Sequence, residues 1–176
     1  CGLMILSALL SIPIFIEVAF ENNVRVIELF TWFDAGAFEA SWALHFDTLS
    51  AVMVLTVSVV SSAIHVYSVG YMSHDKSIPR FMAYLSLFTF FMLTLVTADN
   101  FMQLFFGWEG VGLLSYLLIG FWFDRESANA ASIKAFLVNR VGDFGFALGI
   151  MGTFLLFGSV DFDTVFHAAP AAAGAS

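Results

Sequence analysis

The chain has 176 residues, of which 60% are hydrophobic and only 11% are charged, and its mean hydropathy is +0.92. A soluble domain carries roughly 25% charged residues, so this composition is typical of a membrane protein. The formal net charge of −8 argues against nucleic acid as a partner. A single cysteine cannot form a disulfide pair or an iron–sulfur set, the four histidines show no metal-ligand spacing, and no dinucleotide motif occurs. We therefore expect no redox cofactor in this chain.

Five apolar segments are long enough to cross about 30 Å of hydrocarbon at about 1.5 Å per residue. We predict an all-α fold, a polytopic transmembrane helical bundle, with a small β-hairpin on its outer surface as a further expectation. The predicted spans, in chain order, are about 2–20, 48–70, 81–98, 101–122 and 131–157.

The two ends of the chain suggest a piece of a longer protein. It begins at Cys1, no charged region precedes the first apolar segment, and an Ala-rich run follows the last one. The beginning does not resemble a signal peptide. We expect residues 1–157 to form a fragment of one transmembrane domain and residues 158–176 to form a truncated outer tail.

Charge in the connections predicts an orientation. Connections 71–80 and 123–134 hold four of the six basic residues, whereas 21–47 holds five acids and one base. The positive-inside rule places the first two connections in the cytoplasm, and 21–47, the Asp99–Asn100 turn and the tail outside. Within 21–47, apolar runs flank Asp34-Ala35-Gly36, a pattern that suggests a β-hairpin. An irregular or amphipathic interfacial segment is the alternative.

The fourth segment keeps one carboxylate, Glu109, between Trp108 and Gly110. A charged side chain at the centre of a bilayer costs about 2.5–3.5 kcal/mol on insertion scales, so it usually has a function. Glu109 lies about 20 Å from the inner end of its segment, which carries no base to pair with it. Burial favours the protonated acid, and a nearby cation favours the ionised one. We predict a proton-relay group; a protonated glutamate that serves packing is the alternative.

Four further residues are candidates for the same relay. Arg140 and Asp143 lie three residues apart on one face of the fifth segment, about 14 and 18 Å deep. They either neutralise each other so that the helix can insert, or tune Glu109 electrostatically. Lys134 is an inner relay or a side chain that extends to the interface. His65, on the second segment, is a weaker relay candidate or an ordinary interfacial histidine.

Four stretches of the sequence closely resemble the antiporter-like membrane subunits of proton-translocating NADH–quinone oxidoreductase, in their L or chain 5 form. They are YSVGYMSHD (67–75), RFMAYLSLF (80–88), ADNFMQLFFGWEGVGLLSYLLIGFW (98–122) and KAFLVNRVGD (134–143). The resemblance implies that Glu109 matches the family's essential membrane glutamate, and that Arg140 and Asp143 match its arginine and aspartate on the following helix. It also implies that the lysine partner of the glutamate lies on a later helix, beyond Ser176.

The resemblance further implies a function. The chain would be a subunit of an enzyme, NADH:ubiquinone reductase (H⁺-translocating), that couples quinone reduction elsewhere in respiratory complex I to proton pumping. NADH, FMN, iron–sulfur clusters and quinone would be held by other subunits. Its partners would be other membrane subunits, the lipid bilayer and protons.

The expected location is the bacterial inner membrane, with the mitochondrial inner membrane as the alternative. Two other functions stay open: a subunit of an Mrp-type sodium/proton antiporter, and a structural membrane anchor.

Overall fold

The computed structural model describes residues 1–21, 23–36 and 38–173. Within them, five helices are long and apolar enough to cross a membrane, and a two-stranded antiparallel sheet follows the first. This confirms the predicted fold class. The elements in chain order are α1 (Gly2–Glu21), β1 (Arg25–Ala35), β2 (Phe38–Phe46), α2 (Thr48–Tyr71), α3 (Ile78–Val96), α4 (Phe101–Ile119), α5 (Glu126–Phe157) and α6 (Phe162–Ala173).

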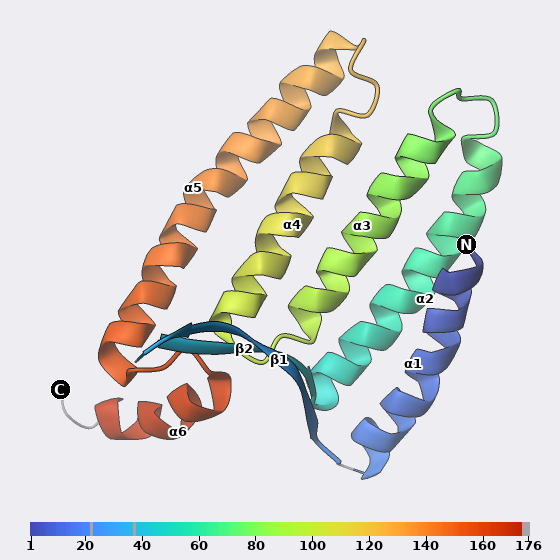
Figure 1. The fold of residues 1–176 in the computed structure, drawn as a ribbon. Coiled ribbons are helices and arrows are strands. Elements are labelled where there is room, and N and C mark those ends of the chain that lie inside the picture. The colour runs from blue at the N-terminus through green and yellow to red at the C-terminus, as the bar shows by residue number, and fades with distance from the viewer. Residues whose placement is uncertain (22, 37, 174–176) are drawn as a thin grey trace.

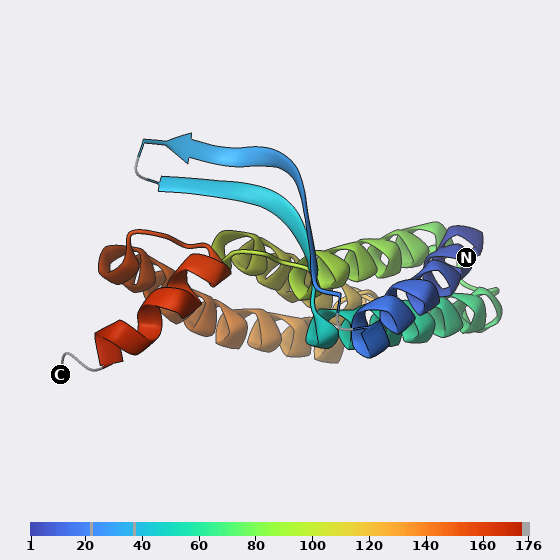
Figure 2. The same cartoon turned by 90° about the horizontal axis from the view of Figure 1, so that it is seen from below.

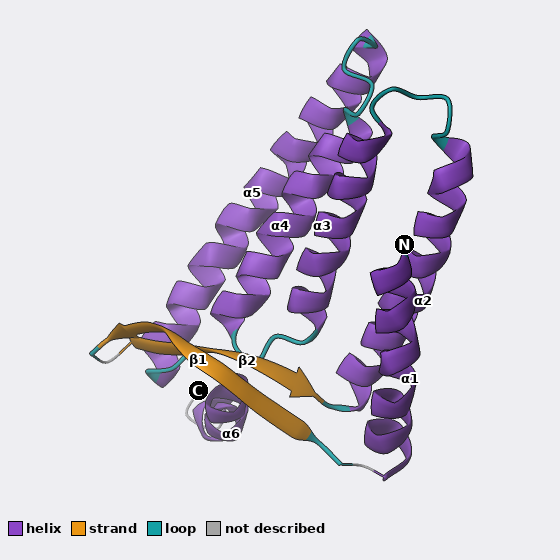
Figure 3. Cartoon of the chain, turned by 45° about the vertical axis from the view of Figure 1, so that its right-hand side comes forward, coloured by secondary structure: helices purple, strands orange, loops and turns teal. Residues whose placement is uncertain are grey.

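The five long helices stand side by side in chain order, and each packs on its neighbour in the sequence (Figure 1). Neighbouring helices run antiparallel: from α2 to α5 the connections between them are short, and the β1–β2 hairpin connects α1 to α2. The α2–α3 and α4–α5 connections lie at one end of the row. The hairpin, the α3–α4 turn and α6 lie at the other end (Figures 1 and 3).

The described chain buries many polar side chains and exposes many large apolar ones. Buried positions include Ser58, Ser62 and His65 on α2 and Gln103 on α4, whereas leucines, valines and phenylalanines cover the outside of the helices. A soluble protein has the opposite distribution. Between helices in lipid, small and polar residues hold the contacts, because the hydrocarbon tails are as apolar as leucine. The arrangement therefore fits a membrane environment.

Local sequence signals explain where several helices begin and end. The Asp47 carboxylate accepts a hydrogen bond from the Ser50 backbone N–H at 2.7 Å and caps α2. Pro79 lies in the first turn of α3, where its missing N–H has no cost. The α5 helix ends at Gly158, which adopts the left-handed conformation with φ of 70°.

Two segments are more helical than the hydropathy pattern predicts. The α5 helix begins at Glu126, five residues before the apolar run, and the expected tail forms the amphipathic helix α6. The α5 extension is polar, and α6 is a 12-residue segment that mixes aromatic and Ala residues with an internal Pro170. Neither segment is an apolar run of membrane length, so a hydropathy profile does not identify it.

The hairpin is a curved ribbon that extends along one side of the helix row (Figure 2). Its strands pair from Arg25 opposite Phe46 to Ala35 opposite Phe38, with register shifts between residues 28 and 30 and between 31 and 33. Such irregularities increase the local bend of a strand. The hairpin expectation is confirmed, and the irregular interfacial alternative is wrong.

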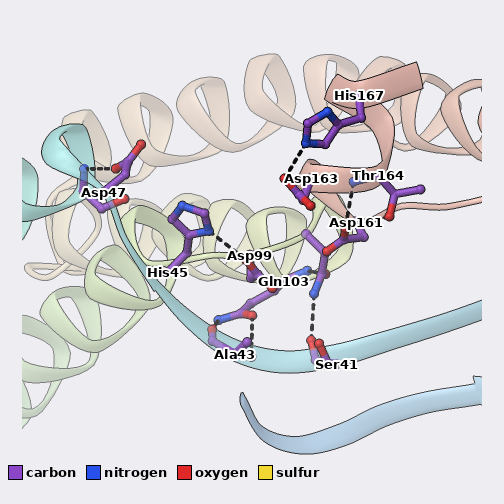
Figure 4. Close-up of polar contacts among 12 residues, drawn as sticks. Ser41, Ala43, His45, Asp47, Asp99, Gln103, Asp161, Asp163, Thr164 and His167 are labelled. Carbon is purple, nitrogen blue, oxygen red and sulfur yellow. Dashed lines mark hydrogen bonds and ion pairs between the residues drawn. The ribbon is translucent and has the colours of Figure 1, made fainter. Parts of the chain in front are cut away.

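Side chains from the start of α4 hold β2 in place (Figure 4). The buried Gln103 amide donates to the Ala43 carbonyl at 2.8 Å and accepts from the Ala43 N–H at 3.2 Å. The Asn100 side chain donates to the Ser41 carbonyl at 2.7 Å. A side-chain amide that makes two hydrogen bonds to one backbone residue fixes both the position and the rotation of its helix relative to that strand. The first turn of α4 is thereby locked to the sheet.

Candidate functional site

The rotation of α4 decides where the membrane carboxylate points. The face of α4 that packs on α3 includes Gly107 and Gly110. A Cβ at Gly107 would lie 2.7 Å from the backbone of Leu95, and one at Gly110 would lie 2.0 Å from the Phe91 ring. Only glycine allows so close an approach. Because this face is occupied by α3, Glu109 and Trp108 are turned toward α5.

Glu109 forms an ion pair with Arg140. One guanidinium nitrogen, Nη1, donates to both carboxylate oxygens, at 2.8 Å to Oε1 and 2.7 Å to Oε2. The Glu109 side chain is 25% exposed and the Arg140 side chain 50% exposed. Glu109 is close to the middle of α4, about 12 Å along the axis from its first residue. The pair therefore lies well inside the candidate membrane span.

Asp143 does not pair with Arg140 in the structure. Its Oδ1 accepts a hydrogen bond from the Trp108 indole N–H at 2.8 Å, and the residue is only 6% exposed. The Trp108 ring also meets Phe146 edge to face, with 5.9 Å between ring centroids. The arginine and the aspartate of α5 thus bind different residues of α4, rather than forming the pair within α5 that spacing allowed.

The structure separates the remaining two candidates from this cluster. Lys134 is exposed on α5, and the described residues give it no ion pair. His65 is buried between α2 and α3, where its ring contacts Ser61 and Ser86 and not Glu109. Three of the five predicted site residues therefore lie together, and two lie elsewhere.

Sequence reasoning missed two features of the site. One is Arg140 as the direct partner of Glu109, because the rotation of two neighbouring helices is not visible in a sequence. The other is Trp108 as the partner of Asp143. A signal for it was present, since an indole N–H at membrane depth needs an acceptor.

The described ranges contain no group of three or more His, Cys, Asp or Glu side chains that could hold a metal ion. A cavity of about 620 Å³ lies at the hairpin end, where His45, Asp47 and Asp163 join apolar side chains of α2, α3 and α6. Glu109 does not line it, so the ion pair and the cavity are separate features.

Two carboxyl groups outside the spans have perturbed acidity. Burial raises the pKa of Asp47, but hydrogen bonds from Ser50 and the proximity of His45 outweigh this, so its pKa lies below the ordinary value of 3.8. The pKa of Asp75 is also lowered, chiefly by the Ser77 backbone N–H and by the indole N–H of Trp122. Both groups are caps or turn contacts and not parts of the membrane cluster.

Two family models match the chain. Residues 32–82 match the model described as NADH-Ubiquinone oxidoreductase (complex I), chain 5 N-terminus. Residues 98–176 match the model described as NADH:quinone oxidoreductase/Mrp antiporter, TM, which includes the helices that carry Glu109 and Arg140. Together they account for most of the chain.

Curated relatives agree with these models. The chain is 57% identical to NADH-ubiquinone oxidoreductase chain 5 of Arabidopsis thaliana, over 93% of this chain and 24% of that protein. It is 52% identical to NADH-quinone oxidoreductase subunit L of Rickettsia felis, over 96% of this chain and 26% of that protein. The chain thus spans about a quarter of the length of these relatives.

A solved structure shares the fold. It is that of the membrane-bound sulfane sulfur reductase, an archaeal respiratory membrane complex, with a TM-score of 0.67 over 91% of this chain and 24% of that chain. Sequence identity is 22%, so this likeness concerns the arrangement of helices alone.

Proposed function

The chain belongs to the antiporter-like family of NADH–quinone oxidoreductase membrane subunits, in its subunit L or chain 5 branch, and we propose that it is a proton-translocating part of such a subunit. In this proposal the oxidation of NADH and the reduction of quinone occur in other subunits, which hold FMN, the iron–sulfur clusters and quinone. The chain itself contributes ionisable side chains at membrane depth. Its location would be the inner membrane of a bacterium or of a mitochondrion.

The observation that carries the proposal is the Glu109–Arg140 ion pair in the middle of a membrane-length helix. While the guanidinium binds the carboxylate, it compensates the negative charge of the ionised form. When the cation withdraws, the carboxylate is left in a poorly solvated place and binds a proton. A change in the distance between two charges is thereby converted into uptake or release of H⁺.

Asp143 offers the Arg140 guanidinium a second carboxylate to bind. It follows Arg140 by three residues on the same face of α5, and it is anchored by the Trp108 indole on the α4 side. In the proposal, Arg140 turns from Glu109 toward Asp143 when Glu109 takes up its proton. The lysine that the resemblance places beyond Ser176 would then act as a further counter-ion on a later helix.

Lys134 would serve the inner side of this route. It lies six residues before Arg140 on α5, about 9 Å along the helix axis, and its side chain is exposed. A flexible ammonium group at this position can extend toward the interface and receive protons from the inner aqueous side.

The test is Glu109→Gln in the full-length subunit, assembled in the complete complex. We expect quinone reduction and assembly to survive and proton pumping into closed vesicles to be largely lost, because an amide cannot exchange the proton. The matched control is Glu126→Gln, which removes an exposed acid at the start of α5. Pumping near the wild-type rate in Glu109→Gln would contradict the proposal.

A second candidate function is an Mrp-type sodium/proton antiporter subunit, since the model matched by residues 98–176 describes both kinds of protein. The chain 5 model over residues 32–82 and the names of the relatives favour NADH–quinone oxidoreductase. Transport by the full-length protein that requires sodium would support the antiporter. If Glu109→Gln changed only stability and not flux, the chain would be a structural anchor instead.

A further inference from the structure

A second polar cluster joins α2 to α3, the adjacent pair of helices in Figure 1, and includes no atom of the Glu109 site. We define it as His65, Ser61, Ser86 and Thr89. His65 is 1% exposed, its Nδ1 lies 2.8 Å from the Ser61 carbonyl oxygen, and its Nε2 lies 3.2 Å from the Ser86 hydroxyl. The Ser61 and Thr89 hydroxyls are 2.5 Å apart. Each of the two helices contributes two of its members.

The hydrogen-bond partners fix the protonation pattern of the neutral ring. A carbonyl oxygen only accepts, so the Nδ1 of His65 must carry a hydrogen and donate it to Ser61. In the neutral imidazole Nε2 is then an acceptor, and the Ser86 hydroxyl donates to it. Thr89 donates to the Leu85 carbonyl at 3.0 Å, so Ser61 supplies the hydrogen between the two hydroxyls.

The same partners also suit the charged ring. An imidazolium donates from both nitrogens, and the acceptors it needs are already in place: the Ser61 carbonyl for Nδ1 and the Ser86 hydroxyl oxygen for Nε2. Addition of a proton at Nε2 therefore requires only that the Ser86 hydroxyl rotate from donor to acceptor. No contact between heavy atoms has to break.

The two α3 members of the cluster differ in exposure: Ser86 is exposed and Thr89 is buried. Ser86 is on a face of α3 that the described residues leave uncovered, so a polar group from the rest of the subunit, and not the lipid, would have to pass a proton to Nε2 on this side. Thr89 is 3% exposed, and its hydroxyl donates a hydrogen bond to the Leu85 carbonyl of the same helix. Proton exchange with His65 is therefore expected through Ser86 alone.

The charged groups near His65 do not compensate a proton placed on it. On α1 the nearest contact is the Cys1 thiol, which donates to the His65 carbonyl at 3.6 Å, while Glu17 binds Arg25. On α2 the other ionisable groups are two exposed tyrosines, and on α3 they are Tyr84 and Arg80, whose guanidinium binds the Phe121 carbonyl. The described residues place no carboxylate within 4.0 Å of His65.

We propose that His65 is a second proton-binding site of this chain, loaded at Nε2 through the Ser86 hydroxyl and separate from the Glu109–Arg140 pair. The inference rests on the proposed function, because a proton is taken up only if the complex moves protons through this region. Because the described residues place no carboxylate beside His65, a proton bound there would respond to charge movement nearby. His65 would thus store a proton during the cycle rather than hold a permanent charge.

The experiment measures proton pumping and quinone reduction by the complete complex in proteoliposomes between about pH 5.5 and 8, the range in which histidine titrates. The variants are His65→Gln, Ser86→Ala and Ser86→Thr. The control is Ser58→Ala, which removes a buried α2 hydroxyl that has no hydrogen-bond partner in the described region. Glutamine keeps one donor and one acceptor at position 65 but cannot hold a proton.

We expect His65→Gln to lower pumping at least about threefold, a modest part of what an acid–base group contributes, and to flatten the pH profile. Ser86→Ala should give the same change of profile in weaker form, and Ser86→Thr and Ser58→Ala should match the wild type. Infrared difference spectra with isotope-labelled histidine should contain an imidazolium band that His65→Gln removes.

A wild-type rate and pH profile in His65→Gln would overturn the inference. A uniform loss of rate with an unchanged profile would also overturn it, because that is the behaviour of a cross-link between helices. If His65→Gln fails to assemble, an unchanged profile in Ser86→Ala is the refuting result. Glu109→Gln tests the proposed proton-translocating function separately, so a failure of that function can be told apart from a failure of the His65 inference.

Discussion

Replacement of Arg140 by methionine tests whether the guanidinium controls the protonation of Glu109. Two opposite charges about 4 Å apart interact by about 4 kcal/mol at an effective dielectric constant of 20. The Arg140 side chain is 50% exposed and that of Glu109 25% exposed, which moves the value toward the roughly 1 kcal/mol of a surface pair. We therefore expect Arg140→Met to remove about 1–3 kcal/mol of electrostatic attraction from the Glu109 carboxylate.

Infrared spectroscopy measures this directly. The carbonyl stretch of a protonated carboxyl should grow at pH 7 in Arg140→Met, and the band is assigned to Glu109 by its loss in the Arg140→Met, Glu109→Gln double variant. Arg140→Lys should give an intermediate result, since an ammonium supplies charge without the planar guanidinium group. Arg125→Met, at an exposed loop arginine that stacks on Trp122, is the control. An unchanged band in Arg140→Met would refute the ion pair as the determinant of protonation.

Three further predictions concern stability and are measured by thermal unfolding of the purified subunit. Gly110→Ala should destabilise by about 1–3 kcal/mol, because its Cβ would lie 2.0 Å from an aromatic ring, whereas Gly142→Ala, with nothing within 4 Å, should be neutral. Gln103→Leu should cost about 1–3 kcal/mol for each backbone group left unpaired on β2, and hydrogen exchange should increase in the hairpin. Asp47→Ala should cost about 1 kcal/mol at pH 7. Because the folded pKa of Asp47 is lowered, its contribution is present above the unfolded pKa and is lost as the pH falls below about 4, so the difference from wild type should shrink in acid. Equal stability of Asp47→Ala and wild type at pH 7 would contradict this reasoning.

The spans and the hairpin were predictable because both have strong local signals. Apolar runs of about 20 residues mark α1 to α4, and Asp34-Ala35-Gly36 between apolar runs marks the turn, where Gly36 adopts φ of 71°. The first turn of α5 lacks such a signal because it is polar, and α6 lacks it because its 12 residues are too short for a span and include Pro170. Their helical state depends on propensity and on contacts such as the hydrogen bond from the Phe162 N–H to the Asp99 carbonyl.

The site was only partly predictable, for a geometric reason. A charge in an apolar segment identifies Glu109, Arg140 and Asp143 individually, since each is costly to insert. Which charges meet depends on the rotation of α4 against α5, and that rotation is set by Gly107 and Gly110 packing against α3. This is information from a third helix, which neither the spacing within α4 nor that within α5 contains.

The amide clamp between Gln103 and Ala43 has a mechanical consequence. Since it engages both backbone groups of one β2 residue, the ribbon cannot slide or tilt without carrying the first turn of α4 along. Glu109 follows Gln103 by six residues, about 9 Å further along the same helix, α4. A displacement of the hairpin would therefore be transmitted to α4, and with it to the depth at which Glu109 lies in the membrane.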